Sequence, residues 1–235
     1  MDPLTLDAKC VIYRFHSPDG RCYSYDSRAS GYARGEGVVT LILKPLSSAI
    51  RDGNPIRAII RGTSVNSDGR TAGITMPSQS AQECLIRQAY ERAGLDPVET
   101  IFVEGHGTGT QVGDPIEVGA LATVFGKGRE GGRKLWLGSV KTNLGHLEGA
   151  SGLAGVVKAV LMVEKGEIVP NLNFVKANPG IKMEEWNIKV RVVSIYRVFI
   201  MGVYESWLTS IYNVGSKWHE VDPVARWGST PHFSQ

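Results

Sequence analysis

Two stretches of this chain follow one order: an apolar strand, a glycine-rich turn that holds a histidine, and an amphipathic helix. The first runs from residues 100–104 (TIFVE) through the turn at His106 to a helix that begins at residues 114–117 (DPIE). The second runs from residues 134–140 (KLWLGSV) through the turn at His146 to a helix whose apolar positions share one face: Leu153, Val156, Val157, Val160 and Leu161. This alternation predicts an α/β fold. Turns that follow strands would place both histidines at the edge of the sheet where sites usually form.

Three further segments carry a readable pattern. Residues 38–43 (VVTLIL) form a continuous apolar run typical of a buried strand, and residues 56–62 (IRAIIRG) predict a second strand. Residues 80–94 place alanine and leucine four positions apart, which predicts an amphipathic helix. We expect a capping box from Ser80 to Glu83 to open this helix and the final glycine to close it.

Asp114 and Glu117 allow two interpretations. As a helix start, Asp114 would be the N-cap, Pro115 the first helical residue, and Glu117 the residue that completes the cap. As a pair of acids, the two carboxyl groups could take part in catalysis. The helix start is favoured, because it explains both residues and the proline between them.

Composition excludes several classes of protein. The 235 residues can bury a sizeable core, and a net charge of +3 with scattered Lys and Arg gives no footprint for nucleic acid. The most apolar stretch, residues 193–212, carries Arg197 and Glu205, and the N-terminus lacks the features of a signal peptide. Three cysteines without a C-x-x-C motif favour a reducing compartment. We therefore expect a cytoplasmic protein that does not cross a membrane.

The two histidine turns match no common pattern for metal or phosphate. Glu104 and His106 lack the H-E-x-x-H spacing, and no third ligand is apparent, so we expect no metal site. The turn GHGTGT departs from G-x-G-x-x-G and has no Walker lysine, which argues against a nucleotide site. Another chemistry must explain the two imidazoles.

Four longer motifs supply an explanation. They are residues 17–38 (SPDGRCYSYDSRASGYARGEGV), 64–78 (SVNSDGRTAGITMPS), 104–110 (EGHGTGT) and 141–152 (KTNLGHLEGASG). Together they resemble the β-ketoacyl synthase, or condensing enzyme, domain of type I polyketide synthases, to which fatty acid synthases are related. The resemblance implies a thiolase-like fold, present here in part: mainly the C-terminal half of a duplicated αβαβα sandwich.

The resemblance also divides the chain. Residues 15–50 would be the end of the N-terminal half of the ketosynthase domain, and residues 51–190 its C-terminal half. Residues 1–14 form an atypical N-terminal segment. Residues 191–235 are rich in aromatic side chains but show neither a sustained helical nor a sustained strand periodicity. This tail is unassigned.

In the family that the chain resembles, two histidines assist the loss of carbon dioxide from a malonyl thioester and stabilise the resulting enolate. By motif these histidines are His106 and His146, and the supporting lysine is Lys141. An imidazole N–H can stabilise a developing oxyanion without carrying a full charge. The loops implied to contact substrate contain Gly105, Thr108, Thr110, Asn143 and Gly145.

The resemblance implies substrates rather than a cofactor bound directly by this chain. They are acyl and malonyl groups carried on the phosphopantetheine of an acyl carrier protein. The partners implied are that carrier protein and the N-terminal ketosynthase half that the sequence lacks, and by family the domain could also form a homodimer.

The family's nucleophilic cysteine lies in a motif of the D-T-A-C-S-S type, and this sequence contains no such motif. Cys22 falls in a segment that follows the nucleophile in the family, Cys84 falls in the helix at 80–94, and Cys10 precedes the resemblance. Without a thiolate no acyl-enzyme forms, so we expect no chain extension by this chain alone. One hypothesis is a fragment of a 3-oxoacyl synthase that performs decarboxylative Claisen condensation when completed. The alternative is an inactive thiolase-fold scaffold that binds a partner chain or carrier protein.

Overall fold

The computed structural model describes residues 15–73, 76–129, 132–192, 196–197 and 209–212. At its centre lies a parallel sheet in the order β2-β3-β5. Strand β2 spans Phe102–Glu104, β3 spans Leu135–Gly138 and β5 spans Ile188–Val190. Val103 pairs with Leu137 across the first two strands. This arrangement confirms the α/β fold that the sequence predicted.

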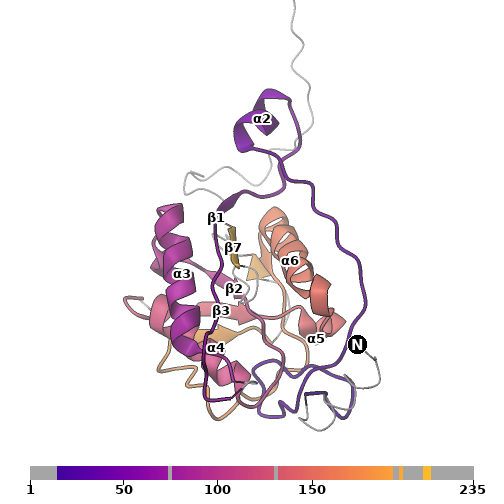
Figure 1. The fold of residues 1–235 in the computed structure, drawn as a ribbon, viewed down its shortest axis with the longest axis vertical. Helices are drawn as coiled ribbons and strands as arrows, with labels where there is room; N and C mark the ends of the chain where they lie inside the picture. The colour runs from indigo at the N-terminus through magenta and orange to yellow at the C-terminus, as the bar shows by residue number, and fades with distance from the viewer. Residues whose placement is uncertain (1–14, 74–75, 130–131, 193–195, 198–208, 213–235) are drawn as a thin grey trace, which may run out of the picture.

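Helices cover both faces of this sheet (Figure 1). Helix α3 (Gln79–Ala93) and helix α4 (Gly113–Leu121) pack on one face, and helix α6 (Ser151–Lys165) packs on the other. Because neighbouring residues of a strand point to opposite faces, Val103 joins the core beneath α3 and α4, while Phe102 joins the core beneath α6. Each face therefore has its own hydrophobic core, which explains why the strands read as continuous apolar runs.

Helix α3 begins earlier than predicted. The Ser78 side chain accepts a hydrogen bond from the N–H of Ala81 at 3.2 Å and is the N-cap. Ser80 lies inside the first turn, so the predicted capping box from Ser80 to Glu83 is wrong. Both serines are good caps, and the pattern alone could not choose between them. Gly94, with φ of 64°, ends the helix as predicted.

Short elements connect the layers. A 3-10 turn, η1 (Pro97–Glu99), leads from α3 to β2, and α4 continues into a π-helical turn, η2 (Ala122–Gly126). Between β3 and α6 lie the four-residue helix α5 (Lys141–Leu144) and a 3-10 turn, η3 (Glu148–Ala150). The sequence predicted a single turn where α5 and η3 stand.

The face that α6 buries agrees with the predicted one only in part. The side chains that it buries include Ala154, Val156, Ala159 and Met162, whereas Leu161 is 46% exposed. Val156 and Val160, both on the predicted face, also pack in or against the core beneath α6. The side chains of Val157, Val160 and Leu161 also line a groove with Leu41, Arg57 and Glu164.

Residues 38–43 do not form the predicted buried strand. The segment runs unpaired along the outside of α6 and leads to helix α2 (Leu46–Arg51), at the top of Figure 1. Val38 is 95% exposed and Ile42 is 96% exposed. A buried strand needs a neighbouring strand and a covering layer. No described strand pairs with this run, although Leu41 packs against the core beneath α6.

Two segments of the tail pair with the body. Strand β7 (Thr209–Tyr212) pairs antiparallel with β1 (Ile60–Ser64), which begins four residues after the start of the predicted strand at 56–62. Strand β6 (Tyr196–Arg197) pairs antiparallel with β4 (Glu167–Ile168). The rest of the unassigned region beyond residue 192, like residues 1–14, lies outside the described residues. Among the described helices, none has the length and apolarity needed to cross a bilayer.

Candidate active site

The two histidines singled out in the sequence meet at one edge of the sheet. His106 follows β2 and His146 follows β3 and α5, and β2 and β3 are neighbours in the parallel sheet. The centroids of the two imidazole rings lie 5.2 Å apart, with the rings nearly perpendicular at 87°. The turns of two adjacent strands thus bring their side chains together, as expected for this class of sheet.

Backbone hydrogen bonds fasten His146 to the segment near residue 34. The His146 N–H donates to the Ala33 carbonyl at 2.7 Å, and the Gly35 N–H donates to the His146 carbonyl at 2.9 Å. Gly145, with φ of 76°, passes so close to the carbonyl of Arg34 that a Cβ would lie 2.8 Å from it. The role of Gly145 is therefore to let the chain reach this segment.

The ring of His146 is oriented by a backbone amide. The N–H of Glu148 donates to Nδ1 of His146 at 3.0 Å. Glu148 has φ of 50°, a left-handed conformation that a glutamate seldom adopts. Because Nδ1 accepts this hydrogen bond, the neutral ring carries its proton on Nε2.

An aromatic row continues from the histidine pair. The ring of Tyr32 lies 4.9 Å from that of His146, and the ring of His16 lies 5.3 Å from that of Tyr32. Arg34 donates to Nε2 of His16 at 3.2 Å and pairs with the Glu148 carboxylate at 3.6 Å. Residues 15–35 thus build one wall around His146, and although most of them belong to the motif at 17–38, that motif did not indicate this contact.

Both polar groups of the His106 backbone are bound. Its N–H donates to Oε1 of Glu117 at 2.6 Å, and its carbonyl accepts a hydrogen bond from the Ser139 hydroxyl at 3.1 Å. The second oxygen of Glu117 accepts the N–H of Gly107 at 2.9 Å. One buried carboxylate thus fixes the turn that holds the imidazole.

Asp114 performs a similar task for the rest of the turn. Its carboxylate accepts the N–H groups of Gly109 at 3.1 Å, of Thr110 at 3.3 Å and of Tyr25 at 2.6 Å. Val112, not Asp114, occupies the N-cap position of α4. The predicted helix-cap roles of Asp114 and Glu117 are therefore wrong, because both side chains bind the turn that precedes the helix.

Burial sets the charge state of Asp114. It raises the pKa of this carboxyl to about 7, an effect increased by the nearby Glu117 and opposed by the three N–H donors. Such a group is poised between its ionised and neutral forms near neutral pH.

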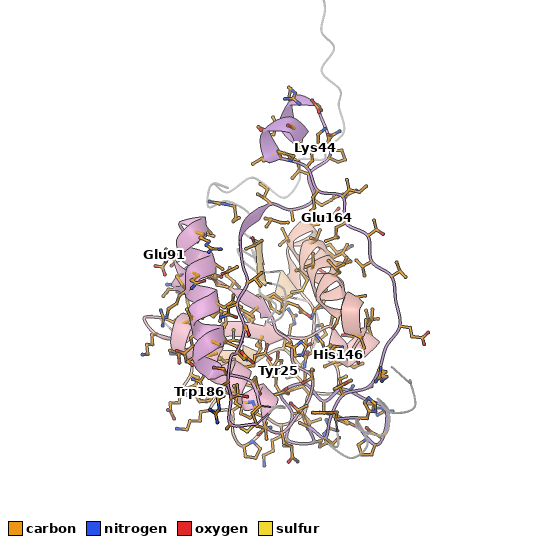
Figure 2. The ribbon with its side chains drawn as sticks, in the orientation of Figure 1. Tyr25, Lys44, Glu91, His146, Glu164 and Trp186 are labelled. Carbon is orange, nitrogen blue, oxygen red and sulfur yellow. The ribbon has the colours of Figure 1, made fainter. Side chains whose placement is uncertain are left out.

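The glycines on either side of His106 pass over a buried phenol. Tyr25 is fully buried, with φ of 66°. Its hydroxyl lies too close to Gly105 to leave room for a Cβ there, and 2.6 Å from where a Cβ on Gly107 would lie. The close approach that the glycines allow at these two positions is therefore to Tyr25, inside the protein. Figure 2 shows Tyr25 and His146 in the same region of the molecule.

Lys141 lies at the start of α5 and is 1% exposed. Burial lowers the pKa of His106 well below its ordinary value, and Lys141 and His146 lower it further. Burial and Lys141 also lower the pKa of His146, which Glu148 partly offsets. Both rings are accordingly neutral at pH 7, so that each holds a single N–H proton.

The remaining predicted residues lie on the two turns. Thr108 and Thr110 are partly buried, with their hydroxyl oxygens 3.5 Å apart, and Thr110 also accepts the N–H of Gly113 at 3.1 Å. Asn143 is exposed, in the same short helix as Lys141. The two turns are thus close to each other at the histidines. The hydroxyls of Thr108 and Thr110 lie on the turn of His106, and the amide of Asn143 lies in the helix that leads to His146.

Neither described cysteine resembles an activated nucleophile. Cys22 is buried and exchanges weak hydrogen bonds with the backbone of Ala33, and burial raises the pKa of its thiol. Cys84 is exposed on α3, on the far side of the sheet from α6. Cys10 lies outside the described residues. The part of the chain that the structure describes contains no cluster of three side chains suited to a metal ion.

Comparison with protein families gives two matches. The model of the β-ketoacyl synthase C-terminal domain matches residues 57–175, and that of the β-ketoacyl synthase N-terminal domain matches residues 3–49. A highly reducing polyketide synthase of Talaromyces stipitatus and a reducing polyketide synthase of Cochliobolus heterostrophus are each 59% identical to this chain over 179 residues. The aligned part is 76% of this chain and 7% of either synthase, so the chain spans a small part of these relatives.

Solved structures show the same relationship. The ketosynthase from module 6 of the bacillaene synthase of Bacillus subtilis is 36% identical, with a TM-score of 0.79. An oxazolomycin ketosynthase domain of Streptomyces albus is 28% identical, also with a TM-score of 0.79. The first match covers 90% of this chain and 39% of that structure, and the second covers 93% and 40%. These similarities show that this chain has a thiolase-like fold.

Proposed function

Because this chain belongs to the β-ketoacyl synthase family, we propose that it supplies the two-histidine part of a ketosynthase site, completed by a separate cysteine-bearing part. The observation that carries the proposal is the contact between the imidazoles of His106 and His146, 5.2 Å apart at the ends of adjacent strands. Neutral rings at this separation can direct N–H groups at one oxygen atom.

The proposed reaction begins with a malonyl thioester. Its terminal carbon–carbon bond breaks, carbon dioxide leaves, and the electron pair moves onto the thioester oxygen as an enolate. N–H donors fixed before the reaction lower the barrier, because they meet the new charge without having to reorganise. For His146 the donor is Nε2–H, since Nδ1 already accepts the Glu148 amide. The enolate carbon then attacks the acyl thioester on the partner's cysteine, and that thiolate leaves.

We also propose that the substrates arrive on the phosphopantetheine arm of an acyl carrier protein. This arm has amide groups that need hydrogen-bond partners. Hydroxyl groups of the kind that Thr108 and Thr110 carry can donate and accept such bonds, and both residues lie on the turn that holds His106. Thr108 is the better candidate, because Thr110 already accepts the Gly113 N–H.

The partner that supplies the cysteine would dock on the apolar segment 38–43. In the solved ketosynthases the matched region is 39–40% of the chain, so residues that correspond to more than half of either structure lie outside the match. Val38, Ile42 and Leu43 are at least 70% exposed, and the groove that Leu41 shares with α6 is lined mainly by apolar side chains. A strand and covering layer from the remaining part of a ketosynthase would bury these groups.

The second candidate function is a scaffold without chemistry. It is favoured by one observation, the absence from the sequence of a D-T-A-C-S-S type motif. Such a scaffold would bind a partner chain or carrier protein with no need for neutral, converging imidazoles.

One experiment separates the two functions. The chain is mixed with the first half of a related ketosynthase, and carbon dioxide release from a malonyl thioester is measured. We expect His106→Ala to lower the rate about 10²- to 10³-fold, the usual effect of removing one oxyanion donor. Glu91→Ala is the control, because Glu91 lies on the outer surface of α3, away from His146 (Figure 2). An equal rate for His106→Ala and the unmodified chain would favour the scaffold.

A further inference from the structure

Glu104 and Lys158 form a buried ion pair beside the histidines. Oε2 of Glu104 lies 2.6 Å from Nζ of Lys158, and their side chains are 1% and 10% exposed. Glu104 is the last residue of β2, and Lys158 lies in the middle of α6. The pair thus joins the sheet to the helix that covers it. Its glutamate lies two residues before His106 in the sequence.

The second oxygen of Glu104 makes a contact of a different kind. Oε1 accepts the backbone N–H of Val140, the residue that precedes α5. The carbonyl of Val140 in turn accepts the N–H groups of Asn143 at 2.9 Å and of Leu144 at 3.1 Å. Val140 therefore sets where α5 begins, and α5 leads from Lys141 to the turn of His146.

Stability gives a weak reason for such a pair. Removing two charges from water is costly, and apolar residues of similar volume often stabilise a protein as well as a buried ion pair does. An apolar pair, however, offers no acceptor to the Val140 N–H. The distinctive contribution of Glu104 is thus the hydrogen bond that its other oxygen makes.

We propose that Glu104 is a positioning residue that holds the turn of His106 and the turn of His146 at a fixed separation through the Val140 N–H. Lys158 balances its charge within the core. Glu104 contacts neither imidazole in this role. Its effect on the site comes from the backbone that it joins.

Two double variants isolate the hydrogen bond from the charges. In Glu104→Gln/Lys158→Met the amide oxygen can still accept the Val140 N–H, whereas in Glu104→Leu/Lys158→Met no acceptor remains. Neither variant buries an unpaired charge. Glu164→Gln is the control, because it breaks the Arg57–Glu164 ion pair, which is exposed and also involves α6.

The first readout uses the chain by itself. Nuclear Overhauser contacts between the rings of His106 and His146 are recorded by NMR, with far-UV circular dichroism to check folding. We expect the contacts to persist in the Gln/Met variant and in the control, and to be lost in the Leu/Met variant. Persistence in a folded Leu/Met variant, or loss in the Gln/Met variant, overturns the proposal. If the Leu/Met variant fails to fold, the Gln/Met result still decides.

The second readout rests on the proposed function. With the cysteine-bearing half added, we expect the Leu/Met variant to lower kcat for decarboxylation between about tenfold and 10²-fold, with KM unchanged, because misplaced groups lose transition-state contacts. A purely structural role would instead lower the amount of folded protein and leave kcat per folded molecule intact. If the unmodified chain shows no activity, the proposed function fails, while the ring contacts still test the role of Glu104.

Discussion

The proton on each imidazole depends on contacts made by single residues. At His146 the Glu148 amide occupies Nδ1, which leaves Nε2 as the donor. At both rings, burial and the nearby Lys141 favour the neutral form. The residue that fixes the tautomer and the residue that discourages protonation are thus different, and each can be changed without the other.

The charge state of His106 can be tested by titration. Its pKa lies well below 6.5 in the folded chain, so the ring should remain neutral as the pH falls through 6.5. The folded state then binds fewer protons than the unfolded state below this pH. The contribution of this ring to stability is therefore complete above pH 6.5 and is lost as the pH falls toward the folded pKa.

NMR titration of the ring, assigned with His106→Ala, measures this pKa. Lys141→Met should raise the pKa toward 6.5, because it removes a positive charge and leaves burial as the main cause of the shift. A midpoint at or above 6.5 in the unmodified chain would contradict the charge state described for the site.

Gly105 offers a second test at the residue scale. A Cβ at this position would collide with the hydroxyl of Tyr25, so Gly105→Ala should destabilise the chain by about 1–3 kcal/mol, measured by urea unfolding. Gly149→Ala is the matched control, since a Cβ there meets no atom within 4 Å. Adding Tyr25→Phe to Gly105→Ala should recover part of the loss. Equal unfolding midpoints for the two alanine variants would count against the close contact.

At the scale of elements, local patterns predicted what local contacts determine. The strands at 100–104 and 134–140 and the helix at 80–94 are present, because their periodicity reflects burial against the same sheet. The predicted strand at 38–43 was wrong, since a strand needs a partner and no described strand pairs with this segment. The face of α6 was predicted only in part, because Val156 is buried in the core as expected, whereas Leu161 is 46% exposed and Met162 is buried instead.

The segment 38–43 carries a prediction about pairing. Thr40→Pro removes an N–H that no described backbone group accepts, so stability of the chain alone should change by no more than about 0.5 kcal/mol. In a central strand the same change removes a ladder hydrogen bond. When the Thr40→Pro variant is mixed with the first half of a ketosynthase, the decarboxylation activity that we expect of the unmodified chain should therefore be lost. Retained activity would show that the partner pairs elsewhere.

At the scale of the whole molecule, the motifs located the histidines, but did not indicate which residues support them. His106, His146 and Lys141 were predicted from their turns, and the structure brings the two rings together. Tyr25 and Tyr32 lie in the motif at 17–38 and Glu104 in the motif at 104–110, but no local spacing shows that a residue supports one of the histidine turns. Their roles follow from the packing alone.

The exposed apolar groups of residues 38–43 predict self-association. Large exposed apolar patches on a soluble chain usually become covered. We expect light scattering to show association of the unmodified chain at micromolar concentration, and Val38→Lys/Ile42→Lys to reduce it. The control replaces Lys127 and Arg133, which are exposed on the loop before β3, with glutamate. It shows whether a change of charge alone alters association. A monodisperse monomer of the unmodified chain would contradict the prediction.

The bridge between Arg34 and His146 has a consequence for building chimeric synthases. A crossover placed between residues 50 and 57, where the two family models part, would join the histidine of one parent to the supporting backbone of another. Recombination upstream of residue 15 would keep the two together. The turn of His146 should therefore keep its position better in a chimera with the earlier junction than in one with the later junction.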